Sequence, residues 1–427
     1  MYTSWILSSA IFAIFSFTLY QALPDHAYIH HQDSQGYKAL ADMIQTTGMS
    51  GFDTLPPVGV GYPFILSCIT RVTHYVPGSF HGWLVFFQVC IIILTFFFLY
   101  RLVREVLGDQ YDFLVAFFCV THVGFLTYTQ VCLSEVWLSC LYTIFLYLAV
   151  CSLKESKEFI AAQAGAVLGL SLWIKPAAWI YGWHLAFIAL LVCLFTRSSY
   201  IKSLGTFTAG FCLVGGFNLL FNYWCFGVIG FPPLMYTNLY YFLLPKMLAI
   251  TRGWTFENAV IVAHQWPQEE CLYQLVQVIY EYPGQALSIW LQNMLKTFLG
   301  LFGANLALLA RGVEQASTSF FELPGSCLER IISYCYNEHV GWGWNAITWM
   351  EAILMGMRLI LFIPGWYVLY RRTSIATFYL LFSFVGYFIF ITGADGCARL
   401  RMMSEPVFIL IMVAGFIFFL RGTQFQY

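Results

Sequence analysis

Long apolar runs follow one another along almost the whole chain and limit what it can fold into. A helix needs about 20 mostly apolar residues to cross the roughly 30 Å hydrocarbon core of a bilayer. Only 10% of the residues are charged, whereas soluble domains contain about a quarter. The sequence therefore predicts an all-α integral membrane protein with about ten spanning helices. The runs cover residues 5–23, 82–103, 112–131, 133–152, 159–174, 177–196, 204–226, 346–370, 374–393 and 404–420.

Basic residues in the short loops predict how the spans are oriented. They follow every second run, and cytoplasmic loops carry an excess of Lys and Arg, so we expect both termini in the cytoplasm. The run at 286–309 would break this alternation if it crossed, and we interpret it as an interfacial or re-entrant helix. No basic residue precedes the first run and no cleavage pattern follows it, so we expect it to be retained as a helix. The basic residues are Arg101, Arg104, Lys154, Lys157, Arg197, Lys202, Arg371, Arg372 and Arg421.

This topology leaves two large outer loops, residues 24–81 and 227–345, while each cytoplasmic loop is short. Catalytic and binding residues concentrate on loops that a rigid scaffold positions, so the asymmetry favours an enzyme with an outward-facing site. No internal repeat and no paired broken helices are evident, which disfavours a secondary transporter. The net charge of −1 argues against a nucleic-acid partner. No low-complexity linker divides the chain, so we treat residues 1–427 as one domain.

Two acidic residues stand where spans meet the outer side. Asp33 begins a helical pattern directly after the first span. It is either an ordinary N-cap or a general base placed to take a proton from an acceptor hydroxyl or amine. Glu135 begins the fourth span after a short outer turn. It either complements the helix dipole or supplies a second acidic group facing Asp33.

Three cations predicted on the outer side need anionic partners, because unpaired charges near the membrane are costly. Lys175 lies at the outer end of the fifth span, where it either snorkels to the interface or binds a lipid phosphate. Arg399 and Arg401 enter the last span from outside, against the usual distribution of basic residues. Their candidate partners are Asp395, Glu405 or a ligand phosphate, which an arginine can hold with two hydrogen bonds. Arg358, inside the eighth span, is similarly costly and either pairs with Glu351 or lines a cavity.

In their order along the chain, these motifs resemble the GT-C superfamily of membrane glycosyltransferases. Within it they are most similar to the bacterial branch related to protein O-mannosyltransferases and lipid A aminoarabinose transferases. The blocks fall in the family's order and cover the chain nearly end to end. They are Asp33, Tyr37 and Ala41 in the pattern D-x3-Y-x3-A, residues 61–66, Ser134-Glu135, residues 169–176, Asn222-Tyr223 with Phe226-Gly227, and residues 398–401 with Glu405-Pro406.

The resemblance implies a GT-C fold with juxtamembrane helices in the first outer loop, and inverting transfer of a sugar from a polyprenyl-phosphate donor. It implies that Asp33 is the catalytic base and that Glu135 matches the second acidic position. Some relatives have Asp-Glu where this chain has Asp33-Ser34, so a site with paired carboxylates stays open. Lys175, Arg399 and Arg401 become candidates for binding the donor phosphate.

The resemblance also leaves a divalent metal open, because some relatives bind one and others need none. His30, His31 and Glu135 could contribute ligands, although their spacing does not define a metal site. We further expect three tyrosines to contact the substrate, with packing in the core as the alternative. They are Tyr37, Tyr62 and Tyr236.

Two other functions fit parts of the pattern. A transporter or flippase of a lipid-linked sugar would explain the outer cations but not Asp33. An O-antigen ligase or polymerase would rely on Arg and His in a late loop and not on an acid in the first. Candidate acceptors are a glycolipid such as lipid A, a cell-wall polysaccharide or a protein. Because no endoplasmic-reticulum retention signal is present, we expect a bacterial inner membrane, with the active site on its outer side.

Overall fold

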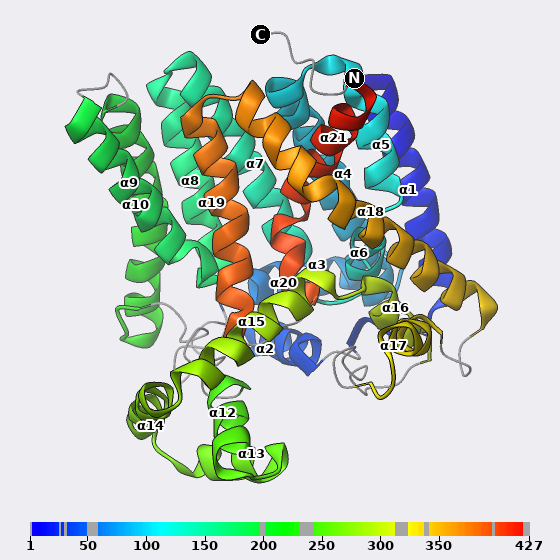
Figure 1. Cartoon of the computed structure of the whole chain (residues 1–427), viewed down its shortest axis with the longest axis vertical. Coiled ribbons are helices and arrows are strands. Elements are labelled where there is room, and N and C mark those ends of the chain that lie inside the picture. Colours follow the sequence, from blue (N-terminus) through cyan, green and yellow to red (C-terminus); the bar gives the residue numbers. More distant parts are fainter. Residues whose placement is uncertain are drawn as a thin grey trace.

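The computed structural model describes residues 2–24, 27–29, 32–48, 59–196, 201–230, 242–311, 323–336, 341–394 and 398–421. Within these residues the chain is built from helices and short turns, and no strand occurs among them. The long helices form one bundle, and shorter helices gather at one of its ends (Figure 1). The predicted all-α class is confirmed.

Six helical segments among the described residues are long and apolar enough to cross a membrane. They are α1 (Tyr2–Ala22), α4 (Phe80–Leu107), α7 (Glu135–Glu155), α10 (Ile201–Phe226), α18 (Trp342–Arg372) and the segment Ala398–Leu420, which contains α20 (Ala398–Arg401), η8 (Met402–Ser404) and most of α21 (Glu405–Arg421). Three further predicted runs form shorter apolar helices. These are α8 (Glu158–Ile174), α9 (Trp179–Thr196) and α19 (Ile375–Ile391).

The predicted run at 112–131 is not one continuous helix. It forms α5 (Asp112–Val120) and α6 (Val123–Tyr128), separated by a turn at Thr121 and His122. The His122 ring accepts a hydrogen bond from the backbone N–H of Phe125 at 3.2 Å and so caps a new helix. The apolar pattern alone did not reveal this interruption, because the apolar composition continues across it.

Basic side chains gather at one end of the bundle. Lys154 Nζ at the end of α7 is 3.2 Å from Glu105 Oε2 in α4. Arg372 Nη1 at the end of α18 donates to the carbonyl of Leu107 at 3.1 Å. Glu135 begins α7 and therefore lies about 30 Å from Lys154, at about 1.5 Å per residue. The start of α1 and the end of α21 lie at the same end as these basic residues (Figure 1).

The opposite end carries the predicted outer segments, folded as short helices (Figure 1). The first segment, in which juxtamembrane helices were expected, forms α2 (Gln32–Thr47) and α3 (Gly61–Tyr75). The run predicted as one interfacial or re-entrant helix at 286–309 is two helices that meet at residues 300–301. The later segment contains α12 (Leu244–Arg252), α13 (Phe256–Gln265), α14 (Gln268–Glu281), α15 (Pro283–Leu299), α16 (Phe302–Arg311) and α17 (Cys327–Cys335).

The helices α12 to α15 share a small apolar core of their own, separate from that of the bundle. Leu244 and Met247 of α12 pack there with Leu275 of α14 and Ile289 of α15. The helix α15 also packs against η7 (Thr392–Ala394) and α20. We call this group of helices the α12–α15 module, and α15 connects it to the segment that leads into the last predicted span.

Candidate active site

Four charged side chains from distant parts of the sequence meet at the end of the bundle that carries α2 and α3. Asp33 lies in the first turn of α2 and Glu135 is the first residue of α7. Lys175 directly follows α8, and Arg399 lies in α20. We call these four residues the Asp33 cluster. Asp33 and Arg399 are separated by 366 positions in the sequence and are nevertheless in direct contact.

Arg399 connects the two carboxylates of the Asp33 cluster. Its Nη1 is 2.6 Å from Asp33 Oδ2, and its Nε is 3.4 Å from Glu135 Oε1. Lys175 Nζ lies 3.3 Å from the same Glu135 oxygen. Glu135 therefore faces both cations, and the formal charges of the four side chains cancel.

Burial differs sharply within the Asp33 cluster. The Asp33 side chain is 49% exposed, whereas that of Glu135 is 1% exposed. The Lys175 and Arg399 side chains are also buried, at 9% and 10% exposed. A buried charge costs free energy unless it is paired. The carboxylate of Glu135 therefore makes it possible to bury both cations at the edge of the bundle. Asp33 is the carboxylate of this cluster that incoming molecules can reach.

Burial disfavours the charge on Lys175, but opposing effects led by the carboxylate of Glu135 outweigh it. Together they raise the pKa of the Lys175 ammonium above its ordinary value. Lys175 therefore carries its positive charge throughout the physiological pH range.

Two glycines bring the start of α3 against the end of α8, next to Lys175. A Cβ atom on Gly59 would lie 2.6 Å from the carbonyl oxygen of Trp173, and one on Gly61 would lie 2.7 Å from the same oxygen. No other residue fits such an approach without a shift of the backbone. The turn before α3 therefore packs directly against the backbone that leads into Lys175.

Two of the three tyrosines predicted to contact the substrate, Tyr37 and Tyr62, lie next to the Asp33 cluster. The rings of Tyr37 and Tyr62 pack edge to face with centroids 4.9 Å apart, and both side chains are buried. The Tyr37 hydroxyl is 3.3 Å from Ser134 Oγ. Burial raises the pKa of both phenols, so both stay neutral. Their positions match the packing interpretation as well as that of substrate contact.

A second buried group of charges surrounds Glu405, the first residue of α21. Arg358 of α18 donates to both Glu405 oxygens, at 2.9 and 2.6 Å. His122 Nε2 is 2.8 Å from Oε2, and Arg401 Nε binds Oε1. We call Glu405, Arg358, His122 and Arg401 the Glu405 cluster. The sequence offered two alternatives for Arg358, a pair with Glu351 or a place in the lining of a cavity. Its carboxylate partner is Glu405 and not Glu351, and it does line a cavity.

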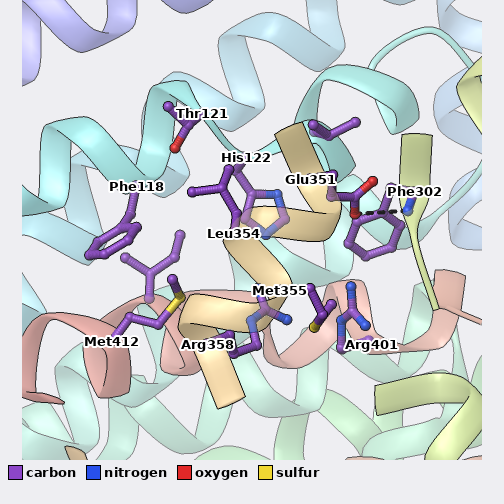
Figure 2. Close-up of a pocket in the computed structure, with 12 residues that line it drawn as sticks. Phe118, Thr121, His122, Phe302, Glu351, Leu354, Met355, Arg358, Arg401 and Met412 are labelled. Carbon is purple, nitrogen blue, oxygen red and sulfur yellow. Dashed lines mark hydrogen bonds between the residues drawn. The ribbon is translucent and has the colours of Figure 1, made fainter. Parts of the chain in front are cut away.

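A cavity of about 30 Å³ lies beside the Glu405 cluster, with room for one or two water molecules. Figure 2 shows His122, Arg358, Arg401 and Glu351 around it. The Glu351 carboxylate accepts hydrogen bonds from the backbone N–H groups of Phe302 and Gly303, at 2.8 and 2.5 Å. It thereby caps the start of α16. The roles of His122 and Glu351 were missed from the sequence, although a buried ionisable residue in an apolar run is a general sign of such a site.

The structure separates Arg401 from the other predicted phosphate ligands, because it belongs to the Glu405 cluster. Tyr236, His30, His31 and Asp395 lie outside the described residues. Among the residues that are described, no group of three or more His, Cys, Asp and Glu side chains could hold a metal ion. The two carboxylates nearest to such a role, Asp33 and Glu135, have the guanidinium of Arg399 between them.

Comparison with solved structures defines the class of fold. No protein-family model matches the sequence, and no curated protein sequence matches it. The structure is similar to the oligosaccharyltransferase of Archaeoglobus fulgidus in its apo form, with a TM-score of 0.55 and 13% identity over 97% of this chain and 50% of that one. The chain therefore spans about half the length of that enzyme. This likeness shows that the chain shares the fold of that enzyme, the GT-C fold, and the six long apolar helices agree with a multi-pass membrane protein.

Two further structures are similar. The archaeal oligosaccharyltransferase AglB from Archaeoglobus fulgidus, in complex with an inhibitory peptide and a dolichol-phosphate, gives a TM-score of 0.54 at 14% identity, over 99% of this chain and 52% of that one. ArnT from Cupriavidus metallidurans bound to undecaprenyl phosphate covers 96% of this chain and 77% of its own, at 9% identity. Its TM-score of 0.40 is too low to support the fold.

Proposed function

We propose that this protein is a glycosyltransferase that moves a sugar from a polyprenyl-phosphate donor to an acceptor at the outer face of its membrane. The observation that carries the proposal is the Asp33 cluster, in which a half-exposed carboxylate adjoins two buried cations. The cluster lies at the end of the bundle opposite the basic residues. Because Lys and Arg are enriched on the cytoplasmic side of membrane proteins, this supports an outer location for the cluster. The archaeal enzyme in complex with dolichol-phosphate supports a lipid-phosphate ligand through its fold.

Asp33 is the general base in this proposal. It takes a proton from an acceptor hydroxyl or amine as that group attacks the anomeric carbon of the sugar. The bond between this carbon and the phosphate oxygen breaks in the same displacement, so the configuration inverts. The acceptor gains the sugar, Asp33 gains the proton, and the polyprenyl phosphate leaves with the bonding electron pair.

Lys175 and Arg399 stabilise the departing phosphate in this mechanism. Charge develops on the leaving group in the transition state, and cations already fixed in place lower its energy. Glu135 is the residue that fixes them, and it does not need to reach the substrate. Arg399 binds Asp33 in the structure, so a donor phosphate that pairs with Arg399 would release Asp33 to act as a base.

The described residues around Asp33 do not fit a divalent metal site. A cation, Arg399, lies between the two carboxylates that would serve as ligands, and its charge repels a metal ion. We therefore propose no step that involves a metal. The positive charge for the leaving phosphate comes from Lys175 and Arg399 instead.

Lipid bound to the purified protein tests the donor class. We expect mass spectrometry of the protein, extracted in mild detergent, to detect a polyprenyl phosphate. We also expect added undecaprenyl phosphate to bind, and to bind at least tenfold more weakly when Lys175→Met removes one cation, which is about 1.4 kcal/mol. Equal affinity in the two proteins would refute the assignment of Lys175 to the donor phosphate. A flippase would also bind this lipid, but it would not require Asp33 for its activity.

A further inference from the structure

The break between α15 and α16 is stabilised by two charged side chains from other helices. A helix end leaves backbone groups without partners inside the helix. Arg401 Nη1 donates to the carbonyls of Thr297 and Phe298 at the end of α15, at 3.0 and 2.5 Å. Glu351 accepts from the first N–H groups of α16, as the dashed line to Phe302 in Figure 2 shows. Arg401 and Glu351 thus hold both sides of the break.

The end of α15 also lies directly on the segment that carries Arg399. A Cβ atom on Gly300 would be 2.7 Å from the Cβ atom of Ala398, the residue before Arg399. Asn293 Nδ2 of α15 donates to the carbonyl of Gly393 at 2.8 Å. A shift of α15 would therefore displace the backbone beside Arg399.

Arg401 itself has little capacity left for a ligand. Its side chain is 1% exposed, and it binds Glu405 as well as the two α15 carbonyls. Its guanidinium also lies 4.6 Å from the centre of the Phe302 ring. Residues two apart on an α-helix point in directions about 200° apart, which explains how Arg399 and Arg401 serve different clusters.

We propose that Arg401 is a positioning residue: it anchors the end of α15 on α20 and so holds Arg399 in place for the donor phosphate. The inference rests on the proposed function of Arg399, and it replaces the direct phosphate contact that the sequence suggested for Arg401. Because α15 belongs to the α12–α15 module, this anchor also couples that module to the geometry of the Asp33 cluster.

A double-mutant cycle on undecaprenyl phosphate binding tests this coupling. Arg401→Lys keeps a positive charge beside Glu405, but a single ammonium cannot also reach both carbonyls of α15. We expect it to weaken binding about tenfold in the otherwise native protein and less than about twofold in an Arg399→Gln background, because only the position of Arg399 is lost. Thermal unfolding of each variant in detergent establishes that it is folded.

Arg358→Lys is the matched control, since the hydrogen bonds of Arg358 to Glu405, at 2.9 and 2.6 Å, and its cation–π contact with Phe408 are all with α21 and not with α15. Its effect on binding should be the same in both backgrounds. Gly300→Ala provides a second test that changes no charge. The added methyl group would lie 2.7 Å from Ala398 Cβ and 2.8 Å from the Lys296 carbonyl oxygen, so it would shift the end of α15 relative to Ala398. It should reproduce the dependence on Arg399 even if Arg401→Lys does not fold.

Equal losses for Arg401→Lys, or for Gly300→Ala, in the native and Arg399→Gln backgrounds would overturn the positioning role. Unchanged binding in the Arg399→Gln protein alone would instead remove the proposed donor site, and this inference with it. The two failures are therefore distinguishable.

Discussion

At the scale of the residue, Glu135 organises the Asp33 cluster although it is almost completely buried. Its Oε1 atom faces both Lys175 and Arg399. Two cations near the membrane surface would repel each other without it. The sequence alone could place Glu135 at a helix start, but its two partners lie 40 or more positions away, and helix periodicity contains no information about such contacts.

Glu135→Gln should strongly destabilise the protein, because it leaves two largely buried cations without their common counter-ion. Loss of one partner from a buried pair costs about 3–5 kcal/mol, so we expect a clearly lower melting temperature in detergent and weaker undecaprenyl phosphate binding. Glu155→Gln is the control: it removes a carboxylate from the other end of the same helix, whose pair with Lys157 is solvent-exposed and worth little. Similar melting temperatures for the two variants would contradict this role of Glu135.

Tyr37→Phe separates packing from substrate contact. The substitution removes only the hydroxyl that lies 3.3 Å from Ser134 Oγ, which should reduce stability by about 1 kcal/mol. The ring would keep its contact with Tyr62. We expect the rate of sugar transfer to change less than about twofold if Tyr37 only packs, whereas a loss of about tenfold or more would establish a substrate contact.

At the scale of the element, the position of the Asp33 cluster depends on close backbone contacts between helix ends. Gly61, the first residue of the block at 61–66, allows the start of α3 to touch the backbone at the end of α8. The sequence revealed this block and its helix. It could not reveal that the break after α5 depends on His122, whose partner Glu405 is 283 positions away.

Gly61→Ala should displace α3 from α8 and disturb Lys175. The new Cβ atom would lie 2.7 Å from the carbonyl oxygen of Trp173, which is backbone and cannot rotate away. We expect weaker undecaprenyl phosphate binding and a lower melting temperature. Gly216→Ala in α10 is the matched control, because a Cβ atom there meets nothing within 4 Å. If both variants bind the lipid like the native protein, the contact between α3 and α8 does not shape the donor site.

At the scale of the whole molecule, the sequence anticipated the GT-C fold and named Asp33, Lys175 and Arg399 as candidate site residues, which lie close together in the structure. Apolar runs and loop charges were enough for the membrane class, since they follow directly from the cost of placing polar groups in lipid. The order of the motifs along the chain predicted the GT-C fold and the candidate site residues. The Glu405 cluster and the role of Arg401 in it could not be predicted, because they depend on which buried charges meet after the helices pack.

The positions of the basic residues predict the orientation of the bundle. Both ends of the described chain lie at the basic end (Figure 1), which should face the cytoplasm. A green fluorescent protein fused to the C-terminus should therefore fluoresce in a bacterial host, and an alkaline phosphatase fused there should be inactive. The reverse pattern would place the Asp33 cluster on the cytoplasmic side.

The most direct test is to compare transfer and binding for the native protein and Asp33→Asn. Asparagine has nearly the same shape as aspartate but cannot accept the proton from the acceptor. Sugar transfer from polyprenyl-phosphate donors extracted from the native membranes should fall by at least about a hundredfold, while undecaprenyl phosphate should still bind. Full transfer by Asp33→Asn would contradict the assignment of Asp33 as the catalytic base.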